Sequence, residues 1–173
     1  MKNGFLIGFS IFTCIFIITC TNKAKQEEMT KNSPEELKEY QGVKLSSVSD
    51  FYENSIQGPQ QIDKEKYKLT INGLVLNPKN FTYDQVIEHQ KHQRVIPLNC
   101  VEGWSVNILW EGILVRDLLK EAGIDPQAEI VIFYAHDGYS TSFPLNYVLD
   151  NDIIMAYKMN GLPLLPERGF PFE

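Results

Sequence analysis

Turn-forming residues recur every few positions from about residue 51 to the end of this chain, which limits the region to short strands and short helices. Pairs such as Asn72-Gly73 and Asn160-Gly161 favour tight turns, because asparagine and glycine tolerate left-handed backbone angles. This spacing argues against a bundle of long helices. It is typical of an α+β domain with a mixed β-sheet and short helices.

Apolar periodicity predicts which segments are strands and which are helices. Alternating or continuous apolar residues predict strands at residues 67–71, 95–98, 106–110, 130–134 and 153–159. The 3.6-residue spacing and helix-start signals predict helices at residues 82–93, 115–122 and 144–149. A capping box at Ser33-Pro34-Glu35-Glu36 predicts one more short surface helix, continuing to about Tyr40.

The first 20 residues resemble an export signal. An uncharged apolar run from Phe5 to Ile18 follows Lys2 and is too short for a stable membrane span. The ending Ile17-Ile18-Thr19-Cys20 resembles a lipoprotein signal, in which cleavage before Cys20 leaves a cysteine that is lipidated. We therefore expect an exported protein that is lipid-anchored to the periplasmic or extracellular face of a bacterial membrane. An uncleaved signal anchor or a soluble secreted protein is the alternative.

Composition divides the rest of the chain into two parts. Residues 20–49 are rich in Lys, Glu, Ser and Asn, so they are predicted to be a polar spacer after the signal peptide at residues 1–19. Residues 50–173 hold enough apolar material for one domain. The net charge of -6 argues against a nucleic-acid partner, because no basic surface is available to neutralise phosphates.

Cys100 is the most informative single residue of the domain. Cys14 lies in the signal peptide and Cys20 is expected to carry lipid, so Cys100 has no internal partner for a disulfide. It follows a predicted strand, and a thiolate there would be a well-directed soft ligand for a transition metal. The alternative is that Cys100 is a small buried hydrophobic residue.

Other residues that can carry chemistry have simpler interpretations. His89 and His92 could chelate a metal from one helix, but their polar neighbours favour a solvated helix face. His136 could deprotonate the Cys100 thiol, although His136-Asp137-Gly138 is typical of a tight turn.

Aromatic and basic residues are interpreted in the same way. The aromatic residues of the domain core are expected to pack rather than to stack on a planar ligand; they include Trp104, Trp110, Tyr134 and Tyr139. The basic residues Arg94, Lys158 and Arg168 are surface charges singly, but a convergent group would suit a phosphorylated ligand.

Several motifs of the domain occur together in one order. They are Glu53–Gln60, Asn99–Ser105, Asp137–Tyr139, Ala156–Gly161 and Arg168–Pro171. The joint pattern resembles the sulfite oxidase-like family of molybdopterin-dependent oxidoreductases and covers roughly residues 50–173.

The resemblance implies a site and a cofactor, which is molybdopterin with molybdenum. The residue at the position of Cys100 binds the metal in that family, beside the two dithiolene sulfurs of the pterin. Arg168 stands where many members have a histidine that meets the pterin phosphate, and arginine can hold that group bidentately. The cofactor-binding residues implied are Asn54, Asn99, Cys100, Tyr139, Lys158 and Arg168.

The resemblance also implies a reaction. It is a two-electron oxidation or reduction that moves an oxygen atom to or from sulfur, with a small-molecule substrate such as a sulfur oxyanion or a sulfoxide. No segment resembles a haem-binding domain, so we expect a separate electron-transfer partner. Two alternatives stay open: a non-catalytic surface lipoprotein that uses a cofactor-free version of the fold as a binding module, and a thiol-dependent enzyme that uses His136.

The chain departs from the family pattern at both ends. Members usually continue beyond the Gly-Phe-Pro segment into further strands and lysine-containing phosphate contacts, whereas this sequence stops at Glu173. We therefore expect an incomplete domain with an unpaired sheet edge. Exported members generally leave the cytoplasm folded behind a twin-arginine signal, and Lys2 alone is not such a signal.

Overall fold

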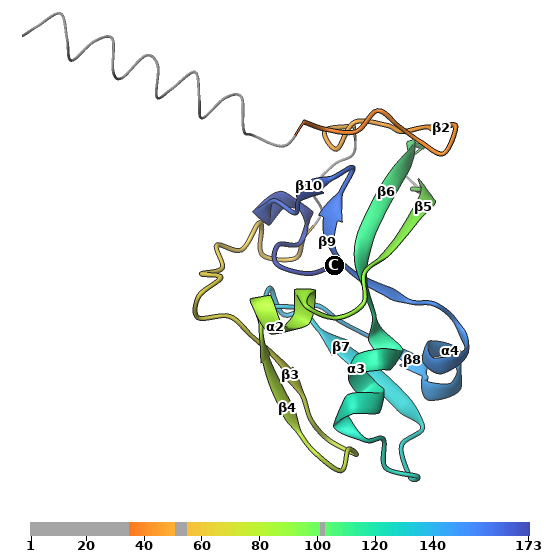
Figure 1. Cartoon of the computed structure of the whole chain (residues 1–173). Helices are drawn as coiled ribbons and strands as arrows, with labels where there is room; N and C mark the ends of the chain where they lie inside the picture. The colour runs from red at the N-terminus through yellow and green to blue at the C-terminus, as the bar shows by residue number, and fades with distance from the viewer. Residues whose placement is uncertain (1–34, 51–54, 101–102) are drawn as a thin grey trace, which may run out of the picture. The chain divides into compact units, whose positions relative to one another are not determined.

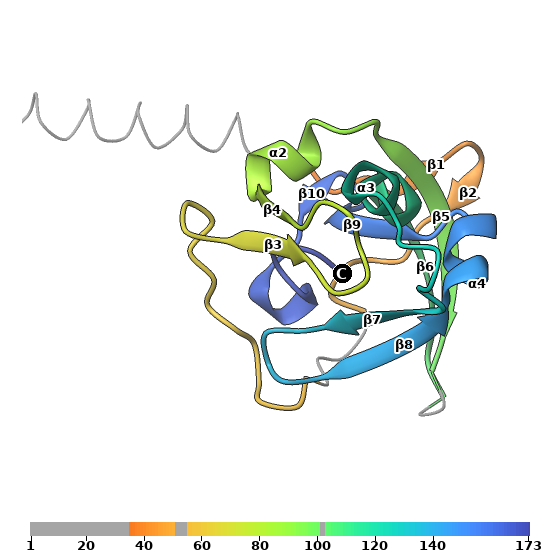
Figure 2. The ribbon, with the colours of Figure 1, turned by 90° about the horizontal axis from the view of Figure 1, so that it is seen from below.

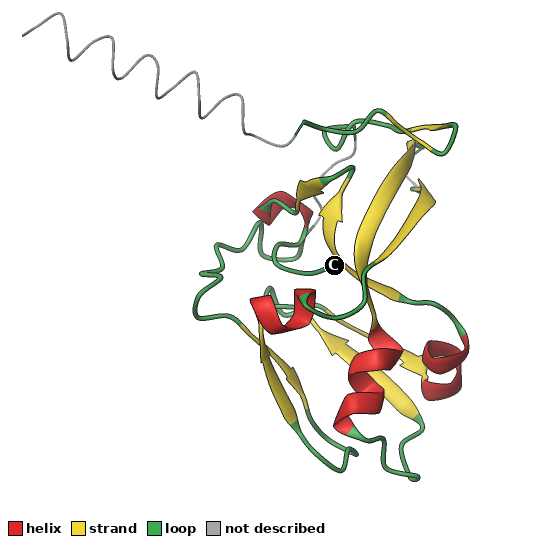
Figure 3. Cartoon of the chain, in the orientation of Figure 1, coloured by secondary structure: helices red, strands yellow, loops and turns green. Residues whose placement is uncertain are grey.

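Short strands and short helices make up the fold of the chain, as the spacing of turn residues predicts (Figure 3). The computed structural model describes residues 35–50, 55–100 and 103–173. No helix in these ranges is long and apolar enough to cross a bilayer. In chain order the elements are β1 (Glu39–Tyr40), β2 (Val43–Lys44), β3 (Lys68–Ile71), β4 (Lys79–Thr82), α2 (Tyr83–Ile87), β5 (His92–Asn99), β6 (Ser105–Leu114), α3 (Val115–Ala122), β7 (Ile130–Tyr134), β8 (Ser140–Pro144), α4 (Leu145–Asp150), β9 (Ile154–Met159), β10 (Leu162–Pro163) and the 3₁₀ helix η1 (Pro166–Arg168).

The largest sheet has four strands in the order β10-β9-β6-β5. β5 pairs with β6 along its whole length, from His92 opposite Gly112 to Asn99 opposite Ser105. β9 pairs with the other edge of β6, and all of these pairings are antiparallel. Figure 1 shows this sheet together with the two-stranded ribbons β3–β4 and β7–β8, and β1 and β2 form a further two-stranded pair. The α+β class with a sheet and short helices is therefore confirmed.

A β-bulge shapes the centre of this sheet. The register between β6 and β9 shifts between Glu111 and Gly112. A Cβ atom on Gly112 would overlap the carbonyl group of Met155 and the Cα of Ala156. Glycine is therefore needed for the close approach of β9, and the bulge turns β6 toward its continuation in α3.

β6 and α3 form one continuous segment that contributes to three hydrophobic clusters. Every second residue of β6 from Val106 to Trp110 belongs to the first cluster. Ile113 and Leu118 belong to the second cluster, and Val115 belongs to the third. In Figure 2, α3 lies beside the sheet while β7 and β8 form a ribbon of their own. The core is thus organised along one stretch of sequence.

Most of the predicted elements are confirmed, and several bounds change. The strand at residues 130–134, the helix at residues 115–122 and the Thr82 capping box all occur. α2 nevertheless ends at Ile87 and does not continue to Gln93. The reason is tertiary, because His92 begins β5 and pairs with β6, and this pairing outweighs a helical continuation.

The N-terminal part of the described chain differs from the sequence predictions. Residues 35–38 are not helical, and Glu39–Tyr40 pairs with β2 as a strand. Leu45 is buried, and the backbone N–H of Ser46 donates to the carbonyl of Asn107 at 2.9 Å. The compact unit begins at Glu35, so residues 35–49 are part of the domain and not of the spacer that composition predicts. We call residues 35–50 the N-terminal strap.

Asn160, in the turn between β9 and β10, holds this strap against β6. Its fully buried side chain accepts a hydrogen bond from the N–H of Leu109 at 3.0 Å. Its Nδ2 donates to Glu36 Oε1 at 3.0 Å and to the carbonyl of Ser46 at 2.8 Å. Its φ of 48° lies in the left-handed region, where asparagine is less strained than most residues. One amide therefore satisfies polar groups of both the strap and the sheet.

Glu36 explains why the predicted capping box does not form a helix. Its carboxylate accepts hydrogen bonds from the N–H of Val48 at 2.7 Å and from Ser47 Oγ at 3.1 Å, in addition to that from Asn160. Burial alone would raise the pKa of Glu36, but these donors and the charge of Lys38 hold it below the usual value. The Glu36 side chain, which the local pattern assigns to a helix start, therefore makes tertiary contacts.

The sequence analysis predicts an unpaired sheet edge without assigning it to a strand, and β9 has a partner at Ala156. Glu173 exchanges two backbone hydrogen bonds with Ala156, at 2.6 and 3.0 Å. β10 pairs with β9 further along, from Leu162 opposite Met159. Both neighbours of β9 on this side are short.

The replacement Asn160→Gly tests the anchor of the strap. Glycine adopts the same left-handed backbone angle, so the change removes only the side-chain hydrogen bonds and leaves the Leu109 N–H buried without its acceptor. We expect the free energy of unfolding to fall by about 3 kcal/mol, the cost of unsatisfied buried polar groups. Gln41→Gly is the matched control, because Gln41 also has a positive φ but is exposed, and it should leave stability nearly unchanged.

The replacement Glu36→Gln tests the acid sensitivity of the strap. Because the folded pKa of Glu36 is lowered, its ionised form contributes stability above pH 4.5, and this contribution is lost as the pH falls below 4.5 through the folded pKa. Urea unfolding at pH 7 and at pH 3 should show a stability difference between wild type and Glu36→Gln that shrinks on acidification. Glu35→Gln, at an exposed neighbour, should show no such trend.

Candidate functional site

Cys100 directly follows β5, in the loop of the β5–β6 hairpin, and its side chain is half-buried. Its backbone N–H donates to the carbonyl of Trp104 at 2.9 Å, and its carbonyl accepts from the N–H of Gly103 at 3.1 Å. Asn99 Oδ1 accepts from Ser105 Oγ at 2.8 Å across the same hairpin. The backbone beside the thiol is thus held on both strands, while the side chain stays partly exposed.

Asp137 ties a second loop to the β7–β8 turn. Its side chain accepts hydrogen bonds from the N–H of Tyr139 at 2.9 Å and from the N–H of Ile56 at 3.0 Å. These two donors hold the pKa of the Asp137 carboxyl below its usual value. The bond to Ile56 fixes the start of the segment that follows Asn54. Asn54 itself lies outside the described residues, as does Cys20.

Glu111 lies buried in the middle of the main sheet, with 6% of its surface exposed. It accepts a hydrogen bond from Gln93 Nε2, and the ammonium groups of Lys158 and Lys91 lie at 3.2 and 3.6 Å from its carboxylate oxygens. Burial opposes its charge, but these partners hold the pKa of Glu111 below the usual value. Burial and the Glu111 charge together raise the pKa of Tyr157 to about 12.

Lys158 is therefore the counter-ion of Glu111. It faces Glu111 from the neighbouring strand, and Gln93 faces Glu111 from the other side. Cys100 follows β5 seven positions after Gln93, which corresponds to roughly 20 Å along a strand. The structure does not bring Lys158 to Cys100.

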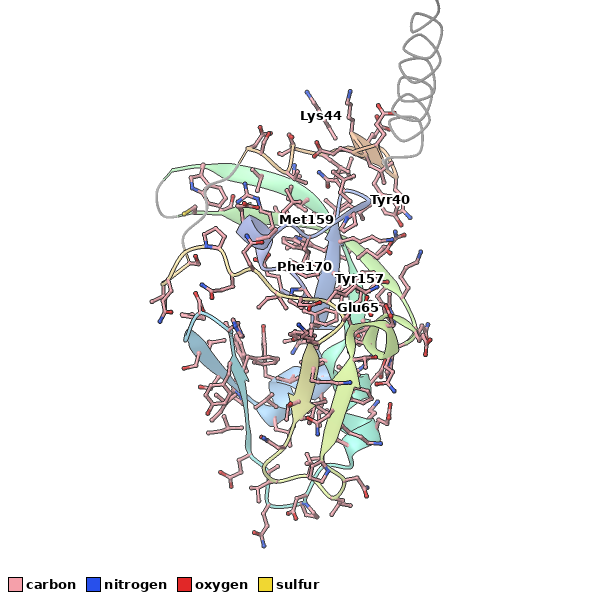
Figure 4. The ribbon with its side chains drawn as sticks, turned by 90° about the vertical axis from the view of Figure 1, so that its left-hand side faces the viewer. Tyr40, Lys44, Glu65, Tyr157, Met159 and Phe170 are labelled. Atoms are coloured by element: carbon pink, nitrogen blue, oxygen red, sulfur yellow. The ribbon has the colours of Figure 1, made fainter. Side chains whose placement is uncertain are left out.

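Arg168, in η1, lies against the strap. Its Nε donates to the carbonyl of Val48 at 3.0 Å, and its Nη1 donates to the carbonyl of Glu167 at 3.3 Å. Its side chain borders a largely apolar groove, whose other lining residues are Val48, Met159, Leu162, Pro163 and Leu165. Figure 4 shows Met159 and Phe170 in the packed interior, with Tyr40 and Lys44 marking the β1–β2 hairpin of the strap. Val48, Trp104 and Phe170 all pack against the first cluster.

The three histidines lie in different elements of the fold. His89 follows α2 and pairs with Glu121 at 3.0 Å; burial lowers its pKa, but the hydrogen bond with Glu121 and bonds to backbone carbonyls raise it above the usual value. His92 begins β5, at the opposite end of that strand from Cys100. His136 lies in the turn between β7 and β8, in another ribbon. Within the described ranges no three His, Cys, Asp or Glu side chains gather to hold a metal ion.

The prediction that the aromatic residues pack in the core is confirmed for the two tryptophans only. Trp110 is buried and Trp104 packs partly against the first cluster. Tyr134 and Tyr139 are 77% and 53% exposed, so the prediction that they pack in the core is wrong. Tyr139 is available at the surface of the β7–β8 turn.

Sequence reasoning missed the structural roles of Glu111 and Asn160. Glu111 is the one charged residue in the apolar run of β6, and a charge in a run of this kind signals a buried pair. Asn160 was identifiable only as a turn residue, because the strap that it binds is distant in sequence. No local pattern reveals a partner 124 positions away.

Comparison with known proteins now identifies the family. A family model, the oxidoreductase molybdopterin binding domain, matches residues 56–173. The chain belongs to this family, which is sulfite oxidase-like, and the cofactor that membership implies is molybdopterin with molybdenum.

Individual relatives agree with this assignment. The chain is 34% identical over 116 residues to an uncharacterized oxidoreductase, YuiH, of Bacillus subtilis, a match that covers 66% of this chain and 59% of that protein. It is 33% identical over 138 residues to mitochondrial sulfite oxidase of Drosophila melanogaster, covering 70% of this chain and 23% of that protein. It is 28% identical over 114 residues to a putative protein-methionine-sulfoxide reductase subunit, YedZ1, of Azospira oryzae, covering 66% and 44%.

A solved structure has the same fold. The sulfane dehydrogenase SoxCD from Paracoccus pantotrophus superposes with a TM-score of 0.62 at 25% sequence identity. The match covers 66% of this chain and 34% of that chain. This chain therefore spans less than two thirds of each of these proteins.

The residues around Cys100 fit the implied cofactor. Molybdenum accepts a soft sulfur donor, and Cys100 offers a partly exposed thiol on a hydrogen-bonded hairpin. Gly103 has a φ of 90°, which a residue with a side chain adopts only under strain, so the loop conformation is built into the sequence. A thiol sealed in the hydrophobic core would not have met this requirement.

The replacement Asp137→Asn tests the tie between the two loops. An amide presents one acceptor oxygen in place of two, so either Ile56 or Tyr139 loses its bond. Hydrogen exchange should become faster at the Ile56 or the Tyr139 amide while the β5–β6 amides are unchanged. Asp125→Asn is the matched control, because Asp125 makes a similar turn bond to Gln127 elsewhere, and it should not alter either amide.

Proposed function

We propose that this domain is a molybdenum oxidoreductase in which the Cys100 thiolate binds the metal of molybdopterin. The observation that carries the proposal is a partly exposed cysteine directly after β5, in a chain that belongs to the molybdopterin-binding family. When bound, the cofactor supplies two-electron chemistry with oxygen-atom transfer. The protein supplies position and sulfur ligation.

The roles of the surrounding residues follow from their places in the fold. Asn99 closes the hairpin beside Cys100, and Tyr139 offers an exposed phenol on the turn that Asp137 organises. Asn54 lies outside the described residues, and we propose it as a pterin contact because it belongs to the Glu53–Gln60 motif of the family pattern. Lys158 is engaged by Glu111, so we assign the phosphate contact to Arg168, whose planar guanidinium suits bidentate binding.

The proposed substrate is a small sulfur oxyanion or a sulfoxide. The names of two relatives, a sulfite oxidase and a putative protein-methionine-sulfoxide reductase subunit, support oxygen transfer at sulfur. A separate electron-transfer protein would accept or supply the electrons.

The proposed location is the periplasmic or extracellular face of a bacterial membrane, through a lipid on Cys20. Its basis is the apolar run that ends in Ile17-Ile18-Thr19-Cys20. If the protein at that location held no cofactor, it would act only as a binding module.

The decisive experiment is the cofactor content of the whole chain, purified from a host that makes molybdopterin. We expect about one molybdenum and one pterin per chain in wild type, and a loss of most of the molybdenum in Cys100→Ser, because a hydroxyl is a poor substitute for a thiolate. Elemental analysis gives the metal, and fluorescence of the oxidised pterin gives the organic part. Sulfite oxidation and sulfoxide reduction are then assayed with artificial electron carriers.

Thr70→Ala is the control for this change. It removes one exposed hydrogen bond in the β3–β4 ribbon, from Thr70 Oγ1 to Asn80 Oδ1, so molybdenum should be retained. A wild-type chain that contains neither metal nor pterin in such a host would refute the enzymatic proposal and favour the binding module.

A further inference from the structure

His89, just after α2, has a hydrogen-bond acceptor on each side of its ring. Its Nδ1 lies 2.9 Å from the carbonyl oxygen of Gln85 and 3.1 Å from that of Val86. Its Nε2 lies 3.0 Å from Oε2 of Glu121, which belongs to α3. A neutral imidazole has one N–H and one lone pair, so on one side it would set a lone pair against an oxygen. Only the protonated ring can donate to both sides.

Three elements of the fold meet at this ring. Lys79 Nζ on β4 lies 3.2 Å from Glu121 Oε1, so the Glu121 carboxylate joins β4 and His89. The Phe81 ring, also on β4, meets the imidazole edge-on with 5.6 Å between the ring centroids. The His89 side chain is 22% exposed. The ring is therefore held in one orientation but can still exchange a proton with solvent.

The other charged groups near the ring are acidic or already paired. Glu88 lines the same surface hollow as His89 and Glu121, which has a volume of about 300 Å³. Asp84, in the first turn of α2, pairs with Lys64 at 2.9 Å. Burial lowers the pKa of His89, but the bond with Glu121 and the bonds to two backbone carbonyls raise it above the usual value. The surroundings thus favour the charged ring that the geometry requires.

We propose that the contact between His89 and Glu121 is a pH switch, closed while the ring is protonated and open once the proton has passed to solvent. In the neutral ring the remaining proton stays on Nδ1, because two carbonyl oxygens accept there. The Nε2 lone pair then faces the Glu121 carboxylate, so this contact opens while Glu121 keeps its pairing with Lys79. The inference does not depend on the proposed function.

The change on opening is confined to the surface hollow between α2 and α3. Val86 and Leu118 belong to the second hydrophobic cluster, so the two helices stay packed through the core. The folded pKa of His89 is raised above 6.5, so the closed contact contributes stability that is fully present below pH 6.5. This contribution is lost as the pH rises through the folded pKa.

NMR of the isotope-labelled whole chain tests the switch. Nitrogen chemical shifts of the His89 ring should give a titration midpoint above 6.5 and a neutral form that is protonated at Nδ1. Nuclear Overhauser contacts between the His89 ring and the Glu121 side chain should disappear over the same pH range. Contacts between His89 and Phe81 should persist, because the carbonyls of α2 still hold the ring.

Glu121→Gln is the discriminating variant. It keeps an acceptor oxygen but removes the charge, so His89 should bind its proton about threefold more weakly, the size typical of a partly exposed ion pair. Glu88→Gln is the matched control, because Glu88 lines the same hollow while the described hydrogen bonds of the ring go to other residues. It should shift the midpoint by less than half as much.

Four results would overturn the inference. They are a wild-type midpoint at or below 6.5, a neutral ring protonated at Nε2, contacts to Glu121 that persist through the titration, and an unchanged midpoint in Glu121→Gln. If Glu121→Gln does not fold, the midpoint, the protonated nitrogen and the contacts of the wild-type chain decide the question without it.

Discussion

The pairing of β6 with strands on both of its edges is the constraint on which the rest of this structure depends. β5 on one side delivers Cys100 to the end of a long hairpin, and β9 on the other side brings Asn160 to the backbone of Leu109. The continuation of β6 into α3 contributes to all three hydrophobic clusters. The position of Cys100 is therefore set through the same strand that organises the core, and its backbone hydrogen bonds with Gly103 and Trp104 hold the loop beside it.

The main sheet also buries a charged group, and a buried charge without partners destabilises the folded state. Glu111 is buried at the bulge, and its ionised form is held by Gln93 and two lysines. A buried carboxylate with its counter-ions is weak evidence for added stability, because desolvation offsets much of the attraction. Its clear consequence is for Lys158, whose ammonium is paired with the Glu111 carboxylate at 3.2 Å. Lys158 belongs to the Ala156–Gly161 motif, which suggested it as a cofactor contact. In the structure it is instead the partner of Glu111.

Much of the fold was predictable because the local signals agree with tertiary structure. The strand at residues 130–134, the helix at residues 115–122 and the hairpin that presents Cys100 all follow from periodicity and turn residues. The strap was not predictable in this way, since Glu36 and Ser47 are polar residues whose partners are distant in sequence. Of the site, the sequence identified Cys100 and its hairpin by motif, whereas the tie from Asp137 to Ile56 and the bond from Arg168 to Val48 depend on contacts between distant segments.

The account rests on sulfur ligation of the metal by Cys100. X-ray absorption at the molybdenum edge tests this most directly, because it counts the sulfur neighbours of the metal. For the whole chain loaded in a host that makes molybdopterin, the account predicts one thiolate sulfur in addition to the two dithiolene sulfurs, and only the latter two in any metal retained by Cys100→Ser. An identical sulfur shell in the two proteins would contradict it.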